Sequence, residues 1–256
     1  MIHPTALVDK TAILHDGVTV GAYAVIGPNV EIGQDTEISH HTVIEGPTKI
    51  GPNCRIFPFA SIGMEPQDKK FHGESSSLVI GEGNMIREYV TINRGTESGG
   101  GVTTIGDRAW IMAYCHIAHD CEIGNDVVMA NGTTLGGHVI IRDRAITGGM
   151  TGVHQFCRIG EFAITGGQSM ISQDVVPYVI AAGNRAKIAG VNYIGLERNG
   201  FSGKEVEEIN QAYRTFFKIG LTKDVALKKL SEEHADSTRI QTFIDFIRSS
   251  ERGVCR

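Results

Sequence analysis

An aliphatic side chain recurs every sixth residue along most of this chain, and this period constrains the fold more than any other feature. One register contains Ile2, Val8, Leu14, Val20, Ile26, Ile32, Ile38, Ile44, Ile50, Ile56 and Ile62, and it resumes at Ile80, Ile86 and Ile92. A second register contains Ile105, Ile111, Ile117, Ile123, Met129, Leu135, Ile141, Thr147, Val153, Ile159, Thr165 and Ile171. Only Thr147 and Thr165 among these positions are not apolar.

The period of six predicts short strands joined by tight corners, because an amphipathic helix would repeat about every 3.6 residues. Glycine, with 32 residues, often follows the aliphatic residue, as expected at a corner. Three such strands would close a triangular coil of about 18 residues, and each coil would bury its edges against the next, as in solenoid proteins. The predicted fold is therefore mainly β, a parallel β-helix.

Two segments interrupt the repeat and are expected to leave the prism as loops. Residues 63–79 keep the count but place Asp68 and Glu74 at register positions, whereas residues 94–104 break the count itself. Loops on a rigid scaffold commonly carry binding groups. The β-helix with these two loops is expected to span residues 1–190.

A small helical domain is expected over residues 191–256, where the period of six disappears. Ser202 and Glu205 have the spacing of a capping box, and apolar residues follow at helical spacing. Gly220 is expected to end this helix. Further helices are expected near residues 222–234 and 237–250. Their aromatic residues are best explained as the core of this domain.

Composition indicates an ordinary folded protein. Hydrophobic residues make up 41% and charged residues 21%, and the net charge of -5 argues against a nucleic-acid-binding body. No apolar run approaches the roughly 18 residues of a membrane span, and a signal-peptide layout is missing, so a cytoplasmic protein with no integral membrane segment is expected. The five cysteines lack metal-knuckle spacing and are expected to be free thiols.

The segment His116-Ile-Ala-His119-Asp120-Cys places two imidazoles and a carboxylate within the repeat. Residues 18 apart should lie above one another in successive coils, which puts His119 beside Gly137 and Asp120 beside His138. His119 is the candidate general base and the Gly137 N–H the candidate oxyanion donor. Asp120 is the candidate group that orients the imidazole. This pattern suits acyl transfer.

A metal site is the alternative for these histidines. His116, His119, His138 and His154 belong to one solenoid, and three histidines could bind zinc as in a γ-class carbonic anhydrase. The His116-x-x-His119 spacing differs from the wider spacing of that class, so base catalysis is preferred and no metal is expected. A single corner histidine would be explained better as a surface residue, but four in one solenoid favour a site.

Several longer motifs carry a family resemblance. They are His116-Ile-Ala-His119-Asp-Cys, Gly148-Gly-Met-Thr-Gly-Val-His154-Gln155-Phe-Cys, Gln173-Asp-Val-Val-Pro-Tyr-Val-Ile-Ala, Gly190-Val-Asn192 with Gly195-Leu196, Arg94-Gly-Thr and Pro66-Gln67-Asp68. Together they resemble the UDP-N-acetylglucosamine O-acyltransferases of lipid A biosynthesis, within the hexapeptide-repeat acyltransferases, over essentially the whole chain. The resemblance implies a left-handed β-helix, although the general crossover rule favours right-handed connections.

The resemblance also implies an activity. An R-3-hydroxyacyl chain would pass from acyl carrier protein to the 3-position of UDP-N-acetylglucosamine, the first step of lipid A biosynthesis, with no cofactor. The enzyme would be a homotrimer with active sites between adjacent prisms. His119 would be the general base and the Gly137 N–H the oxyanion donor. The implied substrate-binding residues are Asp68 and Lys70 for the sugar nucleotide, His116, His138, His154 and Gln155 along the cleft, and Asn192 and Arg198 at the uridine and diphosphate end.

Two positions depart from the family pattern. Asn93 stands where the pattern has His, and Ile194 stands where it has an acidic residue. Some members accept a 3-amino sugar, so Asn93 leaves the acceptor atom open, and Ile194 removes one polar contact with the nucleotide. Gly167 lies in the region that resembles the acyl-chain ruler, and a glycine there favours a longer chain because it leaves the groove open.

Acyl carrier protein is acidic, so its docking needs a basic surface. The candidates are Arg185, Lys187, Arg198, Arg214, Lys218, Lys223, Lys228 and Lys229. The related N-acyltransferase of the same pathway is a rival, but it usually carries an additional N-terminal domain, whereas this repeat begins at Ile2.

Overall fold

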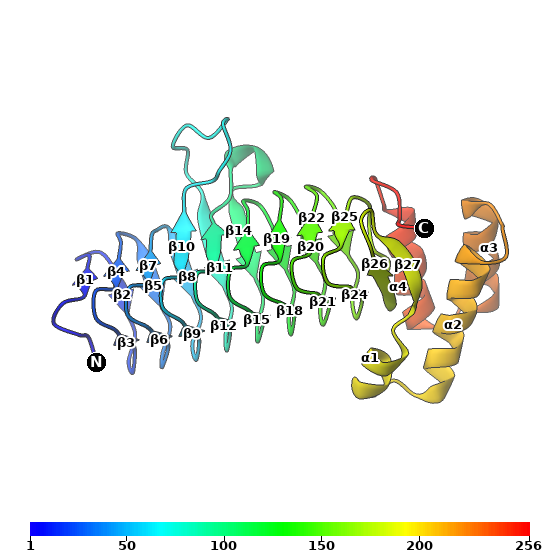
Figure 1. The fold of residues 1–256 in the computed structure, drawn as a ribbon, viewed down its shortest axis with the longest axis horizontal. Coiled ribbons are helices and arrows are strands. Elements are labelled where there is room, and N and C mark those ends of the chain that lie inside the picture. Colours follow the sequence, from blue (N-terminus) through cyan, green and yellow to red (C-terminus); the bar gives the residue numbers. More distant parts are fainter.

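The computed structural model describes residues 1–256 and consists of a long triangular prism of stacked coils followed by a helical segment (Figure 1). Successive coils pair in parallel: Leu7 lies opposite Val25, and His116 lies opposite Thr134. These partners are 18 residues apart, as the period of six predicts. Three sheets form the three faces of the prism.

The strands of each sheet follow one another along the prism. The first sheet contains β1 (Leu7–Val8), β4 (Val25–Ile26), β7 (Val43–Ile44), β10 (Ser61–Met64), β13 (Thr91–Asn93), β16 (His116–Ile117), β19 (Thr134–Leu135), β22 (Gly152–Val153) and β25 (Met170–Ile171). The second contains β2 (Ile13–Leu14), β5 (Val30–Ile32), β8 (Thr48–Ile50), β11 (Ser77–Ile80), β14 (Val102–Ile105), β17 (Glu122–Ile123), β20 (Ile140–Ile141) and β23 (Arg158–Ile159). The third contains β3 (Thr19–Val20), β6 (Glu37–Ile38), β9 (Arg55–Ile56), β12 (Met85–Ile86), β15 (Trp110–Ile111), β18 (Val128–Met129), β21 (Ile146–Thr147), β24 (Ile164–Thr165), β26 (Val179–Ala182) and β27 (Lys187–Val191).

The residues of the two six-residue registers fill the axis of the prism. From Val20 to Ile171 each of them is at most 4% exposed, whereas Ile2 in the first coil is 50% exposed because no earlier coil covers it. Burying one aliphatic side chain per strand stabilises every coil against its neighbours, at about 1.5–3 kcal/mol per side chain. The prism is therefore a rigid support for the residues at its corners.

The two polar register positions are accommodated by hydrogen bonds between threonines. The Thr147 hydroxyl lies 2.9 Å from the Thr133 hydroxyl, and the Thr165 hydroxyl lies 3.3 Å from that of Thr151. All four side chains are buried. Threonine has nearly the shape of valine, so it fills the axial position while its hydroxyl finds a partner in the preceding coil.

Thr147→Val is expected to change the free energy of unfolding by about 1 kcal/mol or less, because Thr133 keeps its hydrogen bond to the Ala130 carbonyl. Ile117→Ala, which leaves a cavity at another buried axial position, should cost about 2–5 kcal/mol. Urea denaturation of both variants measures the difference. A larger loss for Thr147→Val than for Ile117→Ala would contradict this account of the polar positions.

The two loops are shorter than predicted. The first runs from residue 65 to 76 and the second from residue 94 to 101, where a 3-10 turn spans Glu97–Gly99. The residues at their bases belong to strands, because β11 pairs over its whole length with β14 and also pairs with β8. Both loops project from the same edge of the prism, near β10 and β14 (Figure 1).

The C-terminal segment covers the last coils of the prism. β27 pairs antiparallel with β26, which ends the regular stacking. Four helices follow: α1 (Tyr193–Arg198), α2 (Gly203–Phe217), α3 (Lys223–Glu233) and α4 (Thr238–Arg248). Ser202 and Glu205 form the predicted capping box of α2, whereas the six-residue helix α1 was not expected. None of these helices combines the length and the apolar character that crossing a membrane requires.

Candidate functional site

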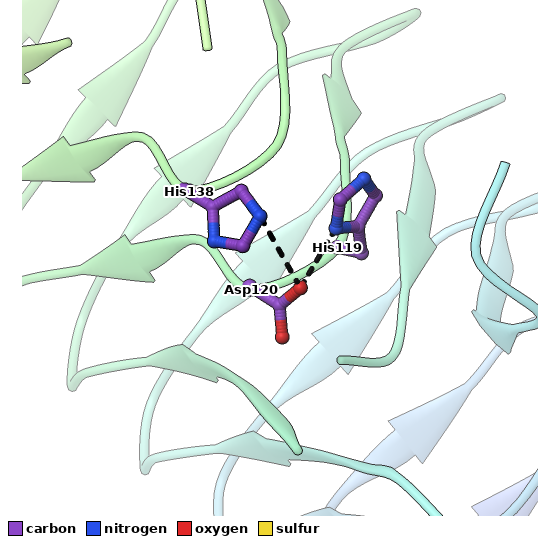
Figure 2. Close-up of side chains that lie close together, drawn as sticks. All are labelled: His119, Asp120 and His138. Atoms are coloured by element: carbon purple, nitrogen blue, oxygen red, sulfur yellow. Dashed lines mark hydrogen bonds and ion pairs between the residues drawn. The ribbon is translucent and has the colours of Figure 1, made fainter. Parts of the chain in front are cut away.

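Three polar side chains meet at one edge of the prism (Figure 2). His119 and Asp120 lie at the corner that follows β16, and His138 lies at the equivalent corner after β19. Asp120 and His138 both have a left-handed backbone, with φ of 59° and 61°, so their side chains leave the corner in the same way. His119 Nδ1 lies 2.7 Å from Asp120 Oδ2, and His138 Nε2 lies 3.8 Å from the same oxygen.

The contact with Asp120 fixes the tautomer of a neutral His119 ring. An ionised carboxylate only accepts hydrogen bonds, so the ring donates from Nδ1. The lone pair then resides on Nε2, at the other side of the ring. This is the arrangement that a histidine needs to accept a proton from a substrate hydroxyl.

Gly137 lies against the His119 ring. A Cβ on Gly137 would lie 2.5 Å from His119 Cε1 and 2.7 Å from Nε2, so only glycine leaves room for the ring. The Gly137 residue is buried, and its N–H donates to no backbone carbonyl or side chain. The corner geometry leaves this N–H free, as it does those of His119 and Gln155 at the equivalent corners. A free donor beside a proton acceptor suits the binding of a developing oxyanion.

The Asp120 side chain is fully buried, and the second loop encloses it. Thr96 donates its backbone N–H to Oδ1 at 2.8 Å and its hydroxyl to Oδ2 at 2.6 Å. The Asp120 N–H in turn donates to the Thr103 hydroxyl at 2.8 Å. Asp120 is therefore held on both of its oxygens and on its backbone.

Two further histidines of the site favour the neutral state. Burial lowers the pKa of His116, and a positive charge on His119 would lower it further. Burial also lowers the pKa of His138, although the nearby Asp120 carboxylate opposes this shift. The His138 ring stacks on Phe156 with ring centroids 4.4 Å apart. Near neutral pH these two rings therefore offer hydrogen-bonding groups without adding charge.

The same three side chains are the group best able to hold a metal ion, since one ligand atom from each of His119, Asp120 and His138 lies within 4.8 Å of the others. Two features favour a proton over a cation. The distance of 2.7 Å between His119 Nδ1 and Asp120 Oδ2 is that of a hydrogen bond, and Oδ2 also accepts the Thr96 hydroxyl. A metal would have to displace both donors.

The other residues predicted for substrate binding are more dispersed. Asp68 Oδ1 accepts the Lys70 N–H at 3.0 Å in a turn of the first loop, and the Asp68 charge acts on His138. Lys70 is exposed, as are His154 and Gln155 one coil beyond Gly137. The structure thus brings Asp68 towards the histidines, while Lys70, His154 and Gln155 face solvent.

The C-terminal candidates lie apart from His119 along the prism. Asn192 is buried, donates to the Phe162 carbonyl at 2.9 Å and accepts the Gly195 N–H, so it caps α1. Its side chain is occupied by these contacts, and its role at the nucleotide stays a prediction. Arg198 and Ile194 are exposed on α1, and Gly167 is exposed at the corner before β25.

Sequence reasoning did not identify Thr96 or Phe156 as parts of the site. Thr96 lies beside Asp120, and Phe156 lies beside His138. Because Phe156 is 18 residues after His138, the coil register could have indicated this second contact. A groove of about 350 Å³ is lined by Asp120, His138 and Phe156, and also by Arg252 in the C-terminal tail.

Comparison with known proteins gives one consistent family. The description "Udp N-acetylglucosamine O-acyltransferase; Domain 2" matches residues 174–255, and "Bacterial transferase hexapeptide (six repeats)" matches residues 11–46 and 103–137. The acyl-[acyl-carrier-protein]–UDP-N-acetylglucosamine O-acyltransferase of Halorhodospira halophila is 50% identical over 255 residues, which cover 100% of this chain and 99% of the relative.

Solved structures agree. The UDP-N-acetylglucosamine O-acyltransferase of Moraxella catarrhalis has a TM-score of 0.97 at 44% identity, with 100% of this chain and 99% of that chain covered. The Francisella novicida UDP-N-acetylglucosamine acyltransferase has a TM-score of 0.98 at 39% identity, with 100% and 94% covered. The predicted fold class, a mainly β left-handed parallel β-helix with a C-terminal α-helical domain, is confirmed. On these grounds the chain belongs to the UDP-N-acetylglucosamine O-acyltransferase family.

Proposed function

We propose that this protein transfers an R-3-hydroxyacyl chain from acyl carrier protein to the 3-hydroxyl of UDP-N-acetylglucosamine, the first step of lipid A biosynthesis. One observation carries the proposal. A His119 ring that Asp120 orients, with Nε2 free, packs against Gly137, whose N–H has no partner. The names of the relatives supply the two substrates.

The chemistry needs only these groups. His119 Nε2 removes the proton from the sugar hydroxyl as its oxygen attacks the thioester carbonyl carbon. The Gly137 N–H donates to the carbonyl oxygen, which carries the negative charge of the tetrahedral intermediate. The carbon–sulfur bond then breaks, and the His119 imidazolium returns the proton to the departing thiolate. The products are the 3-O-acyl sugar nucleotide and the free thiol of the carrier protein.

The remaining assignments are parts of the same proposal. Asp68 and Lys70 bind the sugar nucleotide, and His116, His138, His154 and Gln155 line the cleft. Asn192 and Arg198 bind the uridine and diphosphate end, and Gly167 leaves the acyl-chain groove open for a longer chain. The exposure of His154 and Gln155 in the single chain supports a homotrimer in which a neighbouring prism completes the site. A cytoplasmic location follows from the two proposed substrates.

The test is turnover by the full-length protein with UDP-N-acetylglucosamine and R-3-hydroxyacyl carrier proteins of several chain lengths, with the products identified by mass spectrometry. A 3-O-acyl product supports the proposal, and no acylated product from any donor contradicts it. The 3-amino analogue of the sugar nucleotide is tested in parallel, because Asn93 keeps a 3-amino sugar open as the alternative acceptor. Loss of activity on chelation, restored by zinc, would favour the metal alternative.

A further inference from the structure

The second loop closes over the carboxylate that orients His119. The Thr96 hydroxyl donates to Asp120 Oδ2, the same oxygen that accepts from His119 Nδ1, and the two distances are 2.6 Å and 2.7 Å. Gly99 packs so closely that a Cβ there would overlap the carboxylate. Thr96 is 2% exposed and the Asp120 side chain is fully buried, so water does not take part in these contacts.

The loop that carries Thr96 is itself fixed to the prism. The Arg94 side chain is 13% exposed, and its Nη1 donates to the Gly63 carbonyl at 3.0 Å. The Arg94 N–H donates to the Met64 carbonyl at 3.1 Å, and the Gly95 N–H to the Ser77 carbonyl at 3.1 Å. These contacts join the bases of both loops, so the Thr96 hydroxyl is set in place before substrate binds.

Hydrogen bonds on both oxygens restrain a carboxylate against rotation about its Cβ–Cγ bond. The Thr96 backbone N–H holds Oδ1, and the hydroxyl adds a second, charge-assisted contact on Oδ2. With both in place, Oδ2 stays aligned with His119 Nδ1. Without the hydroxyl, the carboxylate is held less tightly, and the ring loses part of its preference for the tautomer with a free Nε2.

We propose that Thr96 is a positioning residue for the acyl transfer, which acts on His119 through Asp120. This inference rests on the proposed function, because it concerns the same base. Thr96 touches neither substrate nor reacting atoms in this proposal. Its contribution is to the rate of the chemical step, and it leaves the binding of UDP-N-acetylglucosamine unchanged.

Thr96→Val removes the hydroxyl and keeps the shape of the side chain. We expect kcat to fall about tenfold, which corresponds to the lower end of the free energy of one hydrogen bond to a charged group. KM for UDP-N-acetylglucosamine should stay within about twofold of the wild-type value. Thr96→Ser restores the donor and should recover most of the wild-type kcat. Thr42→Val is the matched control: Thr42 is buried and donates to the Phe57 carbonyl, and it precedes β7, three strands from β16 in the first sheet.

A double-mutant cycle separates positioning from a merely structural role. If Thr96 acts through Asp120, Thr96→Val should lower kcat by less than about twofold in the Asp120→Asn background. If Thr96 only anchors the loop, the two losses should multiply, and Thr96→Ser should not rescue. Either result, or a wild-type kcat for Thr96→Val, overturns the inference. Failure of the proposed function is distinct, because the wild-type protein itself would then form no acylated product.

Discussion

His119→Ala is expected to lower kcat by about 10²- to 10⁴-fold, the usual contribution of a well-placed general base. The ring packs against Gly137 while Asp120 holds its Nδ1, which leaves Nε2 as the free proton acceptor. Its removal should therefore leave donor binding and the oxyanion contact intact but abolish the proton acceptor. KM for UDP-N-acetylglucosamine should change much less than kcat.

The control is a histidine in another part of the prism. His40 is exposed and packs edge-on against Phe59, and no catalytic contact is assigned to it, so His40→Ala should keep the wild-type kcat. Product formation in a single turnover, followed by mass spectrometry, gives the chemical step for both variants. Turnover by His119→Ala within a few-fold of wild type would remove His119 from the role of base.

The sequence predicts the positions of those site residues that lie within the regular 18-residue coils. Every coil adds 18 residues, so the vicinity of His119 to Gly137, and of Asp120 to His138, follows from counting along an unbroken register. The same count explains why His138 stacks on Phe156. The close-packed axial residues keep the register constant, and this register determines where the polar corner residues lie.

Where the six-residue period is interrupted, the sequence no longer predicts which side chains lie close together. Thr96 lies in a segment without the period, and only the folded loop brings its hydroxyl to Asp120. Asn192 is a comparable case at the other end of the chain. Its amide lies in the junction between the prism and α1, where it donates to the Phe162 carbonyl and accepts the Gly195 N–H. Local sequence gave no indication of that burial.

Gly137→Ala is expected to lower kcat by about 10²-fold or more, although it adds a single methyl group. The new Cβ would lie 2.5–3.1 Å from three atoms of the His119 ring, closer than van der Waals contact allows. The ring cannot move back freely, because Nδ1 is hydrogen-bonded to Asp120 and Thr96 holds that carboxylate. A displacement of the order of 1 Å in a catalytic group is enough for a loss of this size.

The backbone at Gly137 is not in the left-handed region, so an alanine is conformationally allowed and the effect comes from the ring alone. Gly203→Ala, where a Cβ would meet open space at the first residue of α2, is the matched control and should keep full activity. Overpacking should also cost Gly137→Ala about 1–3 kcal/mol of stability, measurable by urea denaturation. If this variant instead kept the wild-type kcat while remaining folded, the assignment of His119 and Gly137 as base and oxyanion donor would be wrong, because the added Cβ must displace the ring from the position that this assignment requires.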